Sequence, residues 1–135
     1  MDNLKKFFKL DKFAEFSGIE LLEVSEGYAK ASMEITEKHF NGIGTVHGGA
    51  IFTLADFAFA AASNSHGTVA VAINANISFT KAGIAGTLYA EAKETTRTPK
   101  IATYTITVTD DSGDIVSIFD GMAYRKRQKL EDFAD

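Results

Sequence analysis

The chain of 135 residues is 45% hydrophobic and 24% charged, which is typical of one globular domain spanning residues 1–135. Cysteine is absent, so disulfides, thiolate metal sites and a cysteine nucleophile are excluded, and we expect a cytoplasmic protein. The net charge of −4 argues against nucleic acid as a partner, and no apolar run approaches the length of a membrane span.

The first half of the chain begins with a predicted amphipathic helix over residues 1–17, which covers apolar surface. Its apolar side chains recur at roughly helical spacing: Leu4, Phe7, Phe8, Phe13 and Phe16. Residues 19–24 and 28–35 then have the composition of two strands, and the turn at Glu26 and Gly27 predicts that they form a hairpin.

Residues 48–64 predict a helix that is apolar on every face, and such a helix belongs in a protein interior. Four further strands are predicted over residues 69–80, 87–96, 101–109 and 115–124, followed by a charged tail over residues 125–135. A sheet of this size can curl around the buried helix. We therefore predict an α+β fold in which a mostly antiparallel, curved sheet wraps one long helix.

Asp56 is the only charged side chain between His47 and His66, and it lies in the middle of the apolar helix. Burying a carboxylate without partners is costly. Two explanations are open: a structural aspartate bonded to a neighbouring backbone group or hydroxyl, or a carboxylate that faces a cleft where its ionisation is useful.

The same helix begins at His47-Gly48-Gly49, after the loop 41–46. The first N–H groups of a helix lack intrahelical partners and can bind a developing oxyanion, and glycine lets a carbonyl approach. A tight loop would also explain these glycines. Asn41 and His47 flank this start and could orient a water or a carbonyl, although an Asx-turn and a helix cap are simpler roles. Together with Asp56, the pattern favours ester or thioester hydrolysis.

Basic side chains suited to the phosphates of a nucleotide-bearing substrate occur at Lys81, Arg97 and Lys100 and again within residues 125–129, although a solvated face also explains them. His39 and His66 have no companions at metal-ligand spacing. We therefore predict no metal site and place both histidines on the surface or in loops.

The segment from His47 to Asp56, continuing to Asn64, resembles the signature helix of PaaI-like acyl-CoA thioesterases in the hotdog superfamily. The resemblance extends to Asn41-Gly42, to the strand 74–79 and to the turn 110–113. It implies the hotdog fold and hydrolysis of an aryl- or medium-chain acyl-CoA, with no cofactor beyond the CoA of the substrate.

The site residues implied by this resemblance are Asp56 as nucleophile or general base and the Gly48 N–H as the donor that polarises the carbonyl. Asn41 and His47 match positions that place the carbonyl or the water. Gly49, with the three basic residues Lys81, Arg97 and Lys100, is assigned to substrate binding. Two departures stand out: Ala72 occupies the nearest position to a serine or threonine that assists in some relatives, and residues 81–83 replace a frequent Pro-Ala.

The distance between Gly48 and Asp56 along the helix bears on the oligomeric state. Eight residues at about 1.5 Å each separate the two by roughly 12 Å. Both groups must reach one carbonyl. We therefore predict a homodimer with shared active sites, and the resemblance implies a tetramer built as a dimer of dimers. Two other readings of the same fold are a non-catalytic acyl-CoA-binding protein and a dehydratase, which His39-Phe40 resembles although Thr53 stands where that branch has a carboxylate.

Overall fold

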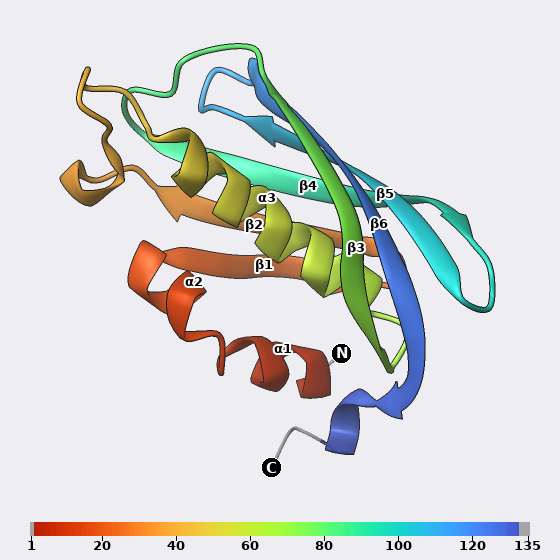
Figure 1. Ribbon diagram of the computed structural model, residues 1–135. Helices are drawn as coiled ribbons and strands as arrows, with labels where there is room; N and C mark the ends of the chain where they lie inside the picture. The colour runs from red at the N-terminus through yellow and green to blue at the C-terminus, as the bar shows by residue number, and fades with distance from the viewer. Residues whose placement is uncertain (1, 133–135) are drawn as a thin grey trace.

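The computed structural model describes residues 2–132, which form one antiparallel sheet curled around a long helix (Figure 1). The six strands lie in the order β1-β2-β4-β5-β6-β3, and every neighbouring pair is antiparallel. The helices are α1 (Asp2–Phe8), α2 (Lys12–Ser17) and α3 (Gly48–Ser63), with the 3₁₀ turns η1 (Glu37–His39) and η2 (Leu130–Asp132). The strands are β1 (Ile19–Ser25), β2 (Tyr28–Glu34), β3 (Thr68–Phe79), β4 (Thr87–Arg97), β5 (Ile101–Thr109) and β6 (Ile115–Lys129). The predicted α+β fold with a wrapped helix is confirmed.

Helix α3 fills the concave side of the sheet because its large apolar side chains pack against the inward-facing strand residues. The Phe59 ring lies 5.6 Å from Tyr104 and 5.7 Å from Phe119, measured between ring centroids. It also lies directly under Gly121, where an added Cβ would come within 2.8 Å of the ring. A residue without a side chain is therefore needed where β6 passes over this ring.

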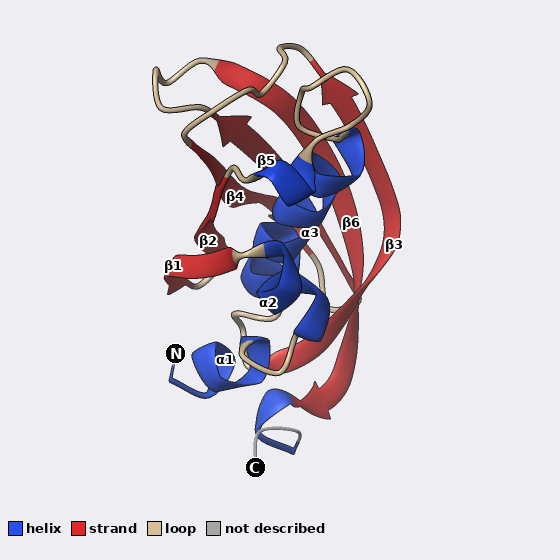
Figure 2. Cartoon of the chain, turned by 90° about the vertical axis from the view of Figure 1, so that its left-hand side faces the viewer, coloured by secondary structure: helices blue, strands red, loops and turns tan. Residues whose placement is uncertain are grey.

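The N-terminal segment differs from the single helix predicted over residues 1–17, of which Met1 lies outside the described residues. Helix α1 ends at Phe8 and α2 begins at Lys12, because the Asp11 carboxylate accepts a hydrogen bond of 3.0 Å from the Ala14 N–H and caps a new helix. The apolar residues consequently do not share one face. Phe8 is buried, whereas Phe13 and Phe16 are 65% and 72% exposed. Figure 2 shows both short helices alongside α3.

The C-terminal segment also differs from the predicted charged tail, because β6 continues to Lys129 as the partner of β3. Strand pairing satisfies the backbone while the charged side chains remain in solvent, so a run of basic residues does not by itself end a strand. Leu130 then inserts into the core with 3% exposure. Residues 133–135 of the predicted tail lie outside the described residues.

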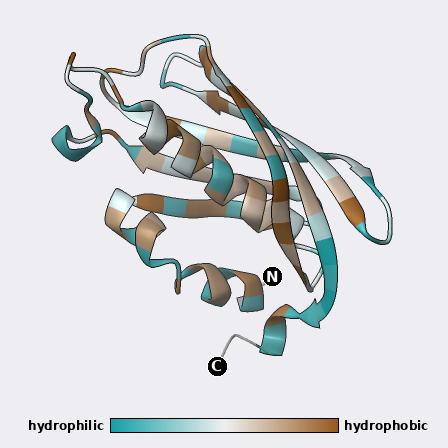
Figure 3. Ribbon diagram, viewed as in Figure 1, coloured by the Kyte–Doolittle hydropathy of each residue, from teal (hydrophilic) through white to brown (hydrophobic). Residues whose placement is uncertain are grey.

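Strand β3 forms one edge of the sheet and pairs only with β6. The edge is long and carries exposed apolar side chains, including Val71 at 39% and Ile73 at 53% exposure. Figure 3 shows apolar segments along this strand. An unpaired edge of this length and composition is a template for pairing with another strand. None of the helices in the described part of the chain is long and apolar enough to cross a membrane.

Candidate active site

The N-terminus of α3 presents one backbone donor that has no acceptor within the described chain. His47 caps the helix, with its Nδ1 accepting a hydrogen bond of 2.8 Å from the Gly49 N–H. The N–H groups of Ala50 and Ile51 both donate to the His47 carbonyl. Among residues 2–132, no acceptor binds the Gly48 N–H. This donor lies at the positive end of a 16-residue helix and is available to an external oxygen atom.

A hollow of about 440 Å³ opens beside this donor. Its walls include Gly48, Ile51, Phe79 and residues 81–83. A Cβ added to Gly48 would lie 3.1 Å from the Phe79 ring, which is 52% exposed. Glycine therefore keeps the space in front of the donor open, and Phe79 forms the side of the hollow nearest to it.

The loop before the helix is organised by Asn41. The Asn41 Oδ1 accepts hydrogen bonds of 3.1 Å from the N–H groups of Ile43 and Thr45, and its Nδ2 donates to Thr45 Oγ1 at 2.8 Å. These are the bonds of an Asx-turn, and they occupy the amide within the loop. In the isolated chain Asn41 shapes the approach to the helix, and its role in placing a carbonyl or a water stays a prediction.

Asp56 lies on the least buried side of α3, between buried neighbours on both sides of the helix. Within residues 2–132, no hydrogen-bond donor contacts its carboxylate. A purely structural Asp56 would be bonded to a neighbouring backbone group or hydroxyl, and the described chain contains no such bond. Burial raises the pKa of Asp56 above its ordinary value, and the nearby negative charge of Asp11 raises it further. A carboxylate held in this way is a stronger base than one in water.

Gly48 and Asp56 belong to one unbroken helix, so the structure does not bring them together within the chain. The axial separation of roughly 12 Å follows from about 1.5 Å of rise per residue. Ala72, the position considered for a third assisting group, is exposed on β3 and offers only a methyl group.

The predicted basic ligands lie at opposite ends of α3. Lys81 borders the Gly48 hollow, but its ammonium group donates hydrogen bonds of 2.7 Å to both Asp110 and Asp114, which raise the pKa of Lys81. Arg97 contacts His66 beyond the C-terminus of the helix, and Lys100 follows in the turn between β4 and β5. The three residues form no single cluster, and their contact with a substrate stays a prediction.

The two histidines outside the helix have structural partners. His39 was expected on the surface or in a loop, but it is only 4% exposed. Its Nδ1 accepts a hydrogen bond from the Thr36 N–H, so its Nε2 carries the proton and donates to the Ser17 carbonyl at 2.7 Å. His66 lies in the turn after α3 and contacts Glu94 at 2.9 Å. In the described chain, no three His, Asp or Glu side chains gather in a way that could hold a metal ion.

Asp11 is the residue near the site that sequence reasoning missed. Its influence on Asp56 arises from the packing of α2 beside α3, and no local sequence pattern indicates contact between two separate helices.

Comparison with known proteins shows which protein family this chain is similar to. The model of a family described as the thioesterase superfamily matches residues 43–117. A putative esterase of Archaeoglobus fulgidus is 44% identical over 119 residues, covering 87% of this chain and 77% of that protein. The acyl-coenzyme A thioesterase PaaI of Escherichia coli is 36% identical over 124 residues, covering 91% of this chain and 89% of that protein.

Solved structures give the same result. The PaaI protein from the phenylacetic acid degradation operon of E. coli matches with a TM-score of 0.91 at 34% identity, covering 95% of this chain and 94% of that one. A Streptococcus mutans protein solved with bound acetyl-CoA matches with a TM-score of 0.80 at 25% identity, covering 84% and 93% of the two chains.

The curved antiparallel sheet around one helix is the hotdog fold, and the matches to the thioesterase superfamily and to PaaI identify the chain as a thioester hydrolase. The chain belongs to the thioesterase superfamily and resembles its PaaI-like members. The predicted family, fold and enzyme class are confirmed.

Proposed function

We propose that the chain hydrolyses acyl-CoA thioesters to a free acid and CoA. The observation that carries this proposal is the pairing, on one helix, of an unused backbone donor at Gly48 with a carboxylate at Asp56 that has no hydrogen-bond donor within the described chain. An E. coli relative named as an acyl-coenzyme A thioesterase and an S. mutans structure with bound acetyl-CoA support CoA as the leaving group.

The working enzyme in this proposal is a homodimer with two composite sites, which assembles further as a dimer of dimers. Because roughly 12 Å separates Gly48 from Asp56 along the helix, one thioester reaches both groups only if they come from different subunits. The exposed edge of β3 supports this assembly, since antiparallel pairing of two β3 edges about a two-fold axis would join the sheets.

In the proposed reaction, the thioester carbonyl oxygen accepts a hydrogen bond from the Gly48 N–H, which stabilises the negative charge that develops there. Asp56 of the other subunit either attacks the carbonyl carbon or takes a proton from a water that attacks it. In both cases the C–S bond breaks, and the CoA thiolate leaves and takes up a proton. When water attacks, its oxygen stays in the released acid. When Asp56 attacks, the acyl group is first held on Asp56 as a mixed anhydride, which a water molecule then hydrolyses to release the acid and restore the carboxylate. His47 holds the start of the helix through its bond to the Gly49 N–H, and Asn41 holds the loop in front of it.

A single turnover in ¹⁸O-labelled water separates the two roles of Asp56. If Asp56 attacks and water then opens the anhydride at the Asp56 carboxyl carbon, the first turnover leaves the label in the carboxylate of Asp56 and the released acid contains none. If Asp56 acts as a base, the label enters the acid directly. A label in neither group would exclude both roles.

For the acyl group we propose an aryl or medium-length chain. The exposed ring of Phe79 beside Gly48 gives an apolar surface near the reacting carbonyl. A panel of phenylacetyl-, octanoyl- and acetyl-CoA measures the preference. We expect kcat/KM for the first two to exceed that for acetyl-CoA by roughly tenfold or more, since each buried methylene contributes about 0.8 kcal/mol. A preference for acetyl-CoA would contradict the assignment.

A further inference from the structure

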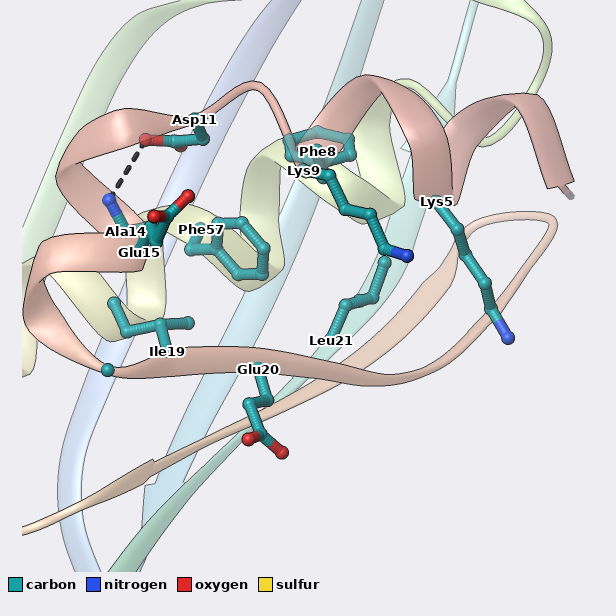
Figure 4. Close-up of a pocket in the computed structure, with 11 residues that line it drawn as sticks. Lys5, Phe8, Lys9, Asp11, Ala14, Glu15, Ile19, Glu20, Leu21 and Phe57 are labelled. Atoms are coloured by element: carbon teal, nitrogen blue, oxygen red, sulfur yellow. Dashed lines mark hydrogen bonds between the residues drawn. The ribbon is translucent and has the colours of Figure 1, made fainter.

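A groove with a volume of about 580 Å³ runs between the N-terminal helices and the edge strand β1 (Figure 4). It contains neither Gly48 nor Asp56, although Asp11 and Phe57, the residue that follows Asp56, belong to its lining. Its lining residues are Lys5, Phe8, Lys9, Asp11, Ala14, Glu15, Gly18, Ile19, Glu20, Leu21 and Phe57.

The inner wall of this groove is apolar. The Phe57 ring projects from α3 and packs edge to face against Phe8 of α1, with 5.3 Å between the ring centroids. Leu21 of β1 is only partly buried, so its side chain remains available on the opposite wall. Ala14 and Ile19 complete this surface with small exposed areas. The wall suits a hydrocarbon chain or ring rather than a polar molecule.

The groove contains two lysines and three carboxylates, of which Glu20 projects from β1 next to Leu21 (Figure 4). Lys5 lies on α1 and Lys9 directly follows it, and Figure 4 shows the Lys9 side chain reaching toward Leu21 while the Lys5 side chain extends beside it, farther from Leu21. Asp11 and Glu15 lie at the other end, and the Asp11 carboxylate already bonds to the Ala14 N–H. Among the described side chains, no carboxylate forms an ion pair with either lysine. The lysine end therefore has two ammonium groups available beside an apolar wall.

We propose that this groove is a second ligand site and that it binds a hydrophobic carboxylate. The apolar body of the ligand lies against Phe57, Phe8 and Leu21, and its carboxylate meets the ammonium groups of Lys5 and Lys9. The acidic end fixes the direction of binding, since Asp11 and Glu15 repel a carboxylate placed there.

Titration of the full-length ¹⁵N-labelled protein with decanoate tests the site by NMR. Decanoate should shift the amide signals of Leu21 and Lys9 in a saturable way, and acetate should leave them unchanged. Decanol should bind about fivefold more weakly than decanoate at low ionic strength, because two exposed ion pairs are worth roughly 0.5 kcal/mol each. Equal effects of acetate, or no decanoate shifts at these residues, would overturn the proposal.

A matched pair of charge reversals isolates the two lysines. The double variant Lys5→Glu, Lys9→Glu should bind decanoate more weakly than the wild type binds decanol, because the two glutamates also repel the carboxylate. The double variant Lys6→Glu, Lys12→Glu changes the net charge equally at exposed positions outside the groove and should keep wild-type affinity. Wild-type affinity in the first variant, or the same loss in both, would remove the assigned role from Lys5 and Lys9.

Discussion

The negative charge of Asp11, at the start of α2, raises the pKa of Asp56 on the neighbouring helix α3. Burial of Asp56 is the larger cause, and both effects disfavour the ionised carboxylate. An enzyme that uses Asp56 as a base or nucleophile needs that ionised form. Under the proposed mechanism, the contact between the two helices would therefore influence the pH at which Asp56 becomes reactive.

Replacing Asp11 with asparagine tests this electrostatic link. The low-pH limb of kcat/KM should follow ionisation of Asp56, and Asp11→Asn should move the limb to lower pH because one cause of the raised pKa is gone. Asparagine is an equally good helix cap, so α2 should persist. Glu15→Gln, which removes another carboxylate from the same helix, serves as the control and should leave the limb in place. An unmoved limb in Asp11→Asn would show that ionisation of Asp56 does not limit the rate.

Asp56 should decrease the stability of the fold while it supports catalysis. A carboxyl group with a pKa raised in the folded state binds its proton more tightly there, so its contribution to stability is lost as pH rises from the unfolded value of 3.8 through the folded pKa. At pH 7, Asp56→Asn should therefore raise Tm by a few degrees while it abolishes turnover.

The difference in Tm between Asp56→Asn and the wild type should shrink as pH falls through the raised pKa. Glu20→Gln, which removes an exposed carboxylate, controls for net charge. A lower Tm for Asp56→Asn at pH 7 would mean that Asp56 has stabilising partners that the isolated chain does not contain.

The backbone donor at Gly48 can be deleted with little change to the helix. Proline is favoured at the first helical position, and His47 has the extended backbone, with ψ of 136°, that a residue before proline needs. Gly48→Pro should lower kcat/KM by about 10²–10³-fold, the usual effect of removing one oxyanion donor.

Gly48→Ala is the matched control, because alanine keeps the N–H and adds only a Cβ near the half-exposed Phe79 ring. Its activity should stay within about tenfold of the wild type, since one donor accounts for the larger loss. Equal losses in the two variants would assign the effect to crowding against Phe79 rather than to the donor.

His47 should contribute to stability as well as to the site. His47→Ala removes the bond to the Gly49 N–H and should lower the free energy of unfolding by about 1 kcal/mol. His47→Asn supplies another cap and should recover most of that loss in urea denaturation. No recovery by asparagine would mean that the ring has a role other than capping.

The sequence predicted the layout of the fold because alternation marks strands with one buried face, as in β2, β4 and β5, and because the apolar composition of α3 on every face places it in the interior. It missed the break between α1 and α2, where the capping bond of Asp11 overrides a stripe of phenylalanines. It also missed the last residues of β6, since pairing with β3 satisfies a backbone whose side chains are charged. Both misses arise from contacts that the local pattern does not contain.

The candidate site was predictable to the extent that it lies on one helix. His47, Gly48 and Asp56 were found because a charge within an apolar helix and glycines at its start are unusual locally. The burial of His39 and the link from Asp11 to Asp56 depend on packing between distant segments. The ion pairs of Lys81, which was predicted to bind substrate, could not be read from the local sequence either. The two carboxylates that bind its ammonium group follow about thirty residues later in the chain.

The most direct test of the composite site is the activity of a purified heterodimer of one Gly48→Pro chain and one Asp56→Asn chain. Each homodimer should be inactive. The heterodimer contains one site with both groups intact, so it should recover about half of the wild-type kcat per dimer, as two-fold symmetry requires. A heterodimer as inactive as the two parent homodimers would show that Gly48 and Asp56 of the same chain act in one active site. That result would contradict the composite site.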